Sequence, residues 1–121
     1  MTYAVLPLTG DPWQVFTLDL MLDGEPLHAQ IELRYFPAAG KWFFSLWDHA
    51  AGELLVNQIP VVCSYGVLND LLFPFRHLRG GKGVGSLFCL RGAESPSTPD
   101  PAEGNLTEFQ IMIGDTFGDR Q

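Results

Sequence analysis

Residues 40–48 read GKWFFSLWD, and this stretch decides the fold because it places four aromatic side chains within six positions. Successive side chains of a β-strand point to opposite faces. One face of the expected strand carries Trp42, Phe44 and Leu46, and the other carries Phe43, Ser45 and Trp47. A strand that is apolar on both faces belongs in the middle of a sheet that is covered on both sides. We therefore expect these rings to be mainly core, with one of Trp42 or Trp47 at a subunit interface as the alternative.

The segments on either side alternate between apolar and polar residues, which is typical of half-buried strands. One such segment runs from Gln14 to Leu22 and the next from Leu27 to Phe36. The Asp23-Gly24 pair between them is a strong signal for a tight hairpin, because its turn requires positive φ. Turns at 37–40 and 49–52, followed by a strand from Glu53 to Cys63, extend the pattern. Strands joined by such short turns form an antiparallel meander.

The chain beyond Cys63 is less regular. Residues 67–73 have helical spacing that Pro74 ends, and 92–105 is a loop rich in proline, serine and glutamate. Strands are expected at 86–91 and 107–113. The sequence thus predicts an all-β fold, an antiparallel meander of six or seven strands that forms a small barrel or sandwich, with one short helix near residues 67–73.

Length and composition fit one folded domain. The chain has 121 residues, 46% hydrophobic and only 17% charged, and we expect a single β domain over 1–113 with a C-terminal tail over 114–121. The net charge of −7 argues against direct nucleic-acid binding, which requires Lys and Arg to neutralise phosphates. No apolar run is long enough to span a membrane, and the N-terminus lacks the basic region of a signal peptide. A soluble protein that folds in a cytoplasm is expected.

No motif indicates an enzyme. The GGKGVG segment at 80–85 lacks the strand and long helix that a phosphate-binding loop requires. The histidines at 28, 49 and 77 are far apart in sequence, and His28 and His49 are expected on the surface, so no metal site is predicted. Cys63 and Cys89 lie in apolar runs and are expected to be buried thiols. We therefore predict no catalytic residues, no cofactor and no metal.

The order of segments nevertheless resembles a known family. It comprises VLPLTGDPWQVFTLDL, an LDG hairpin, IELRYFPAAGKWFFSLWD, an IPVV strand, LNDLL, an Arg-Gly-Gly loop, GSLFCLRG, a Pro/Asp loop and TEFQIMI. This succession, from Val5 to Ile113, is similar to the small baseplate plug proteins of contractile-tailed bacteriophages, typified by a cyanophage baseplate plug. The three prolines in the 92–105 loop depart from that pattern.

The resemblance implies a structural role in the virion. Such a plug sits at the centre of the tail baseplate, at the junction of tail tube and hub, and is assembled in the host bacterial cytoplasm. Its partners would be other hub and tail-tube proteins, and a cyclic homo-oligomer in the assembled tail is expected. From charge and expected exposure, the following residues are predicted to contact neighbouring subunits: Leu71, Leu72, Arg76, Arg79, Lys82, Asp115 and Asp119.

Two other functions remain open from the sequence. The first is a small ligand- or carbohydrate-binding β-module that uses Trp13 or Trp47 as a stacking platform. Such a tryptophan must be exposed and have amide or carboxylate partners nearby. The second is a small β-barrel enzyme or inhibitor, which would require a concave site with titratable groups of perturbed pKa.

Overall fold

Four consecutive strands form one antiparallel sheet in chain order, as the alternating pattern requires. They are β2 (Trp13–Leu22), β3 (Glu25–Phe36), β4 (Lys41–Asp48) and β5 (Glu53–Pro60). Gly24 has a φ of +83°, which lets the chain reverse between β2 and β3. The computed structural model describes residues 3–22, 24–63, 70–72, 75, 84–91, 100–102 and 104–115.

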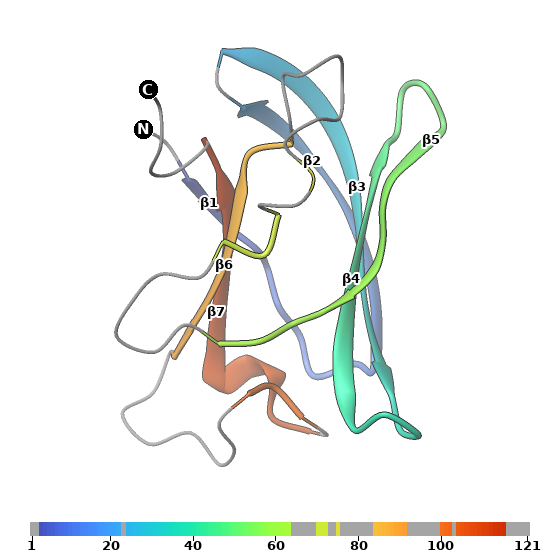
Figure 1. The fold of residues 1–121 in the computed structure, drawn as a ribbon, viewed down its shortest axis with the longest axis vertical. Helices are drawn as coiled ribbons and strands as arrows, with labels where there is room; N and C mark the ends of the chain where they lie inside the picture. Colours follow the sequence, from blue (N-terminus) through green and yellow to red (C-terminus); the bar gives the residue numbers. More distant parts are fainter. Residues whose placement is uncertain are drawn as a thin grey trace.

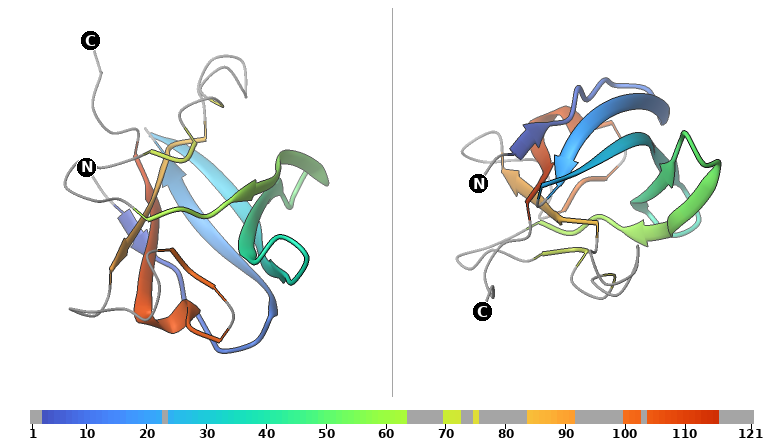
Figure 2. Two further views of the ribbon diagram at one scale, coloured as in Figure 1. Left: turned by 60° about the horizontal axis from the view of Figure 1, so that its bottom comes forward. Right: turned by 90° about the horizontal axis from the view of Figure 1, so that it is seen from above.

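A smaller antiparallel sheet packs against the meander, as Figure 1 shows. Its strand order is β1-β7-β6, built from β1 (Tyr3–Val5), β6 (Ser86–Arg91) and β7 (Phe109–Gly114). A short 3-10 turn, η2 (Leu106–Glu108), leads into β7. Because β1 pairs with β7, the smaller sheet joins segments from opposite ends of the sequence (Figure 2). The result is a β-sandwich of four strands facing three.

The core lies between the two sheets. On β3 and β4 every second side chain points inward, and Ile31, Leu33 and Phe44 have no exposed surface. Leu87, Ile111 and Ile113 meet them from the smaller sheet and are equally buried. Period-two alternation therefore places one apolar face of each sheet against the other.

The structure confirms the predicted all-β, antiparallel fold with seven strands, and the sheets form a sandwich rather than a barrel. Residues 70–72, from the expected helix at 67–73, form a turn, and the rest of that segment lies outside the described residues. Leu72 is fully buried. The strand expected from Glu53 to Cys63 is β5, which ends at Pro60. Within the described part of the chain, no helix is long and apolar enough to cross a membrane.

The expectation that the meander is covered on both faces is not met. Trp42 and Phe44 are core residues, and the Trp42 indole N–H donates a hydrogen bond of 2.8 Å to the Ala102 carbonyl. Phe43 and Trp47, on the other face, are only half-buried. Phe43 and Trp47 therefore contribute less to the core than the side chains on the first face of β4 do.

β5 departs from regular pairing with β4. The register shifts twice, between the partners of Phe44 and Leu46 and again between those of Leu46 and Trp47. Gln58 has a φ of +49°, and its backbone N–H donates to the Ser45 hydroxyl at 2.9 Å. These bulges place Leu55 and Val56, which are adjacent in sequence, both in buried positions. Sequence alternation alone does not reveal such a shift.

Gly85 marks a close approach between β6 and β7. Its φ is +79°, and a Cβ atom at this position would lie 2.1 Å from the carbonyl oxygen of Gly114. Since Ser86 pairs with Gly114, the contact sits at the start of the β6–β7 ladder. Only a residue without a side chain fits there.

We expect Gly85→Ala to lower the free energy of unfolding by about 3 kcal/mol or more, because it adds both a positive-φ penalty and a backbone clash. Gly24→Ala, which has positive φ but nothing within 4 Å, should cost about 1 kcal/mol. Gly10→Ala has neither problem and should be neutral. Urea unfolding of the three variants measures the series. Equal destabilisation by Gly24→Ala and Gly85→Ala would contradict the proposed clash.

Candidate functional site

The outer face of the four-stranded sheet is the surface that turns away from the core. Four of the five large hydrophobic side chains that are exposed in the described part of the chain lie on it. They are Trp13, Val15, Met21 and Leu54, and the fifth, Val5, is on β1. A contiguous apolar patch on one face usually marks a contact site for another molecule, and Trp13 and Val15, which follow one another on the outer face of β2, come nearest to such a patch here.

A tryptophan and an arginine organise one end of this face. Trp13 on β2 is directly opposite Arg34 on β3, and the guanidinium carbon of Arg34 lies 4.6 Å from the centre of the indole ring. The same guanidinium is 5.1 Å from the ring of Phe36. Arginine over aromatic rings is a favourable cation–π arrangement, worth about 0.5–1 kcal/mol where it is exposed. The planar guanidinium therefore contacts both rings.

The remaining contacts of this end, which we call the aromatic end, complete a connected surface. The Trp13 indole N–H donates a hydrogen bond to the Glu32 carboxylate. Phe36 and Phe43 meet edge to face, with ring centres 5.0 Å apart. The aromatic end thus consists of Trp13, Glu32, Arg34, Phe36 and Phe43. It presents flat rings, one cation and one carboxylate.

The loop before β2 fixes the position of Trp13. The neighbouring Gln14 is buried, and its side-chain amide donates to the carbonyls of Thr9 and Asp11 at 2.7 and 2.8 Å. The Gln14 side-chain oxygen accepts the Thr9 backbone N–H at 3.0 Å. These three hydrogen bonds tie the start of β2, next to Trp13, to the preceding loop.

The predicted interface residues fall into two groups. Arg76, Arg79, Lys82 and Asp119 lie outside the described residues. Leu71 and Asp115 are half-buried, whereas the Leu72 side chain has no exposed surface and belongs to the core. The Asp70 carboxylate explains this placement, because it accepts the Leu72 and Leu87 backbone N–H groups and ties the turn to β6.

The sequence prediction overlooked part of the outer face. Trp13 was considered as a stacking residue, but Val15, Leu54 and the position of Arg34 between two rings were not singled out. A signal was present, since β2 carries Trp13, Val15 and Met21 in alternation with its core residues. An edge strand with apolar residues on both faces indicates a second contact surface.

The two cysteines, predicted to be buried thiols, are buried and form no disulfide. Burial raises the pKa of the Cys89 thiol far above its ordinary value, and the adjacent Cys63 thiol and the Asp100 carboxylate raise it further. The Cys63 side chain is hydrogen-bonded to Cys89, so two residues distant in sequence meet in the core. A neutral thiol is a poor nucleophile, which makes Cys89 unsuitable for covalent catalysis.

In the described ranges, no group of three or more His, Cys, Asp or Glu side chains is arranged to hold a metal ion. No protein-family model matches the chain, and a search of curated proteins finds no significant match. The function is therefore inferred from the chain's own surface and chemistry.

Because Cys63 and Cys89 are buried, we expect thiol reagents to modify them slowly. In the native protein at pH 8, we expect Cys63 and Cys89 to react with Ellman's reagent at least about a hundredfold more slowly than in 6 M guanidinium chloride, because the reagent must wait for local opening. Raising the pH from 8 to 9 should accelerate the native and the unfolded protein by a similar factor of about three, because the thiol that reacts after local opening is no longer buried and has its ordinary pKa. Rapid reaction of two thiols in native buffer would contradict the core contact.

Proposed function

We propose that this protein is a structural component of a bacteriophage tail baseplate that plugs the centre of the hub at the tail-tube junction through protein–protein contacts. The observation that carries the proposal is the outer face of the four-stranded sheet, where Trp13, Val15 and Met21 are each more than half exposed. Aromatic residues, methionine and arginine are the residue types enriched in protein interfaces. The succession of segments that resembles baseplate plug proteins supports the same role.

The composition of the outer face suits a docking surface within an assembly. Interface hot spots are enriched in tryptophan, tyrosine and arginine that are held in place before binding. Trp13 and Arg34 are held in this way, by the guanidinium contact and by the Glu32 carboxylate. Other hub and tail-tube proteins are the proposed partners, and further copies of this chain would form a ring around the tail axis.

Two valines allow a matched test of this proposal. Val15 on β2 is 52% exposed on the outer face, and Val5 on β1 is 57% exposed on the smaller sheet. We expect Val15→Lys to reduce incorporation into tails at least about tenfold, because it places a charge within the contact surface, next to Trp13. Val5→Lys should be incorporated like the wild type. Both variants should fold, because neither side chain is in the core.

The measurement is complementation of a phage that lacks the gene. Plaque titre and the amount of this protein in gradient-purified tails are compared for the wild type and the two variants, and immunogold labelling locates the protein on the tail. Absence of the wild-type protein from purified tails would refute the baseplate role. Full incorporation of Val15→Lys would instead refute the use of the outer face.

One observation favours a second function, a carbohydrate-binding module. Trp13 is 57% exposed and has a carboxylate partner in Glu32, which are the features that a sugar-stacking tryptophan requires. Arg34 occupies the region over one face of the ring, so a sugar would use the other face. Calorimetric binding of a glycan by the wild type, lost in Trp13→Ala, would favour this function over the baseplate role.

A further inference from the structure

Two histidines meet at the opposite end of the outer face from the aromatic end. His28 is on β3, and His49 follows the last residue of β4. The His49 backbone N–H donates to the His28 carbonyl at 2.8 Å, which holds the two residues side by side. Their ring centres are 5.1 Å apart, with planes inclined at 58°. This pair cannot be found from local sequence pattern, because the approach of His28 and His49 depends on the β3–β4 register.

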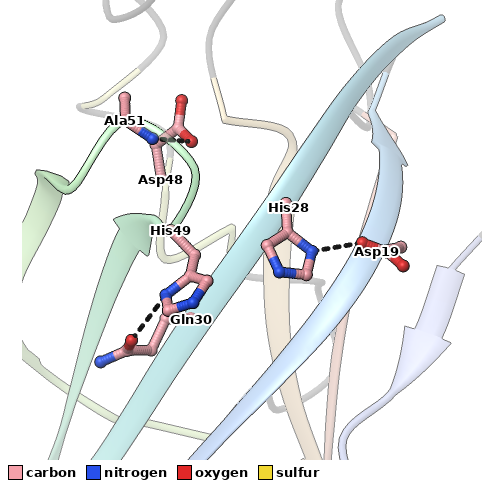
Figure 3. Close-up of polar contacts among 6 residues, drawn as sticks. All are labelled: Asp19, His28, Gln30, Asp48, His49 and Ala51. Atoms are coloured by element: carbon pink, nitrogen blue, oxygen red, sulfur yellow. Dashed lines mark hydrogen bonds and ion pairs between the residues drawn. The ribbon is translucent and has the colours of Figure 1, made fainter.

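Each ring uses its Nδ1 atom for a contact with an oxygen, as Figure 3 shows. His28 Nδ1 contacts the Asp19 carboxylate, and His49 Nδ1 is 3.0 Å from the side-chain oxygen of Gln30. Both oxygens can only accept a hydrogen bond, so the proton of each neutral ring resides on Nδ1. The Nε2 atom of each ring then carries an unshared electron pair.

This arrangement is the one found in histidines that bind metal ions. A ligating histidine usually donates its other ring N–H to a carboxylate or carbonyl oxygen, which fixes the tautomer and the ring orientation. Asp19 and Gln30 supply these two acceptors here. Both rings are therefore oriented as ligands by neighbouring side chains.

The separation of the rings also fits one shared ion. With metal–nitrogen bonds of about 2.1 Å and a tetrahedral angle, two imidazoles on one metal have ring centres roughly 5 Å apart. The observed separation is 5.1 Å. In Figure 3 the Nε2 sides of His28 and His49 both turn toward the space between the rings.

The surroundings are acidic and accessible. A surface hollow of about 470 Å³ beside His28 is lined by Asp19, His28 and Asp48 among others. One oxygen of Asp48 accepts the Ala51 N–H at 3.2 Å. The His28 side chain is 44% exposed and that of Asp19 is 86% exposed, so an ion can enter from solvent. Two carboxylates at the rim favour a cation there.

We propose that His28 and His49 form a two-histidine site for a divalent transition-metal ion, Zn²⁺ or Cu²⁺, bound through Nε2 of each ring. Imidazole nitrogen suits both ions, and Cu²⁺ binds such ligands more tightly. Two protein ligands leave coordination positions for water or for a donor group of a neighbouring molecule. Asp19 and Gln30 are positioning residues. The site does not depend on the proposed baseplate role.

Zinc titration of the untagged, full-length protein tests the site. Calorimetry gives the affinity for Zn²⁺, and NMR of the histidine side-chain nitrogens identifies the ligands. We expect the Nε2 resonances of His28 and His49 to shift on saturation. His28→Ala and His49→Ala should each weaken binding at least about tenfold, because each leaves a single imidazole.

Two aspartate variants distinguish the positioning of the His28 ring by Asp19 from a general effect of negative charge on Zn²⁺ binding. Asp19→Ala should shift the tautomer equilibrium of His28, seen in its nitrogen chemical shifts, and weaken Zn²⁺ binding. Asp11→Ala removes the same charge from an exposed loop residue and should change neither. The proposal is overturned if neither histidine shifts at millimolar Zn²⁺, or if the His28→Ala/His49→Ala double variant binds Zn²⁺ as tightly as the wild type.

Discussion

The structure depends on the contact between the inner faces of two sheets. Ile31, Leu33 and Phe44 of the meander have no exposed surface because β6 and β7 cover them. Side chains alternate with a period of two, so a slip of one residue in any meander strand would turn its polar face inward. This penalty fixes the register of β2 to β4, and the register in turn determines which side chains meet on the outer face.

Much of this arrangement could be predicted from local pattern. Alternation and the Asp23-Gly24 turn gave the β2–β3 hairpin, and the strand expected at 86–91 matches β6. The pairing of β1 with β7 could not be predicted, because strands from opposite ends of a chain carry no local signal for one another. The bulges in β5 could not be predicted either, because they depend on tertiary packing around Ser45 and not on residue type.

The candidate sites were harder to predict than the fold. Trp13 was identified as an exposed ring, but its contact with Arg34 follows from cross-strand register. The same is true of His28 and His49, which are distant in sequence and adjacent in space. From charge and expected exposure, Leu72 was predicted to contact a neighbouring subunit. Asp70 instead anchors its segment to β6, and the Leu72 side chain lies in the core.

The order of pairing has a consequence for synthesis on the ribosome. The four-stranded meander is complete in sequence at Pro60, whereas its cover requires β7, which begins at Phe109. A nascent chain can therefore form the meander before β7 is available to complete the cover of its apolar inner face. During that interval both faces of the sheet are open to water and to other chains, which is the stage at which β-proteins aggregate.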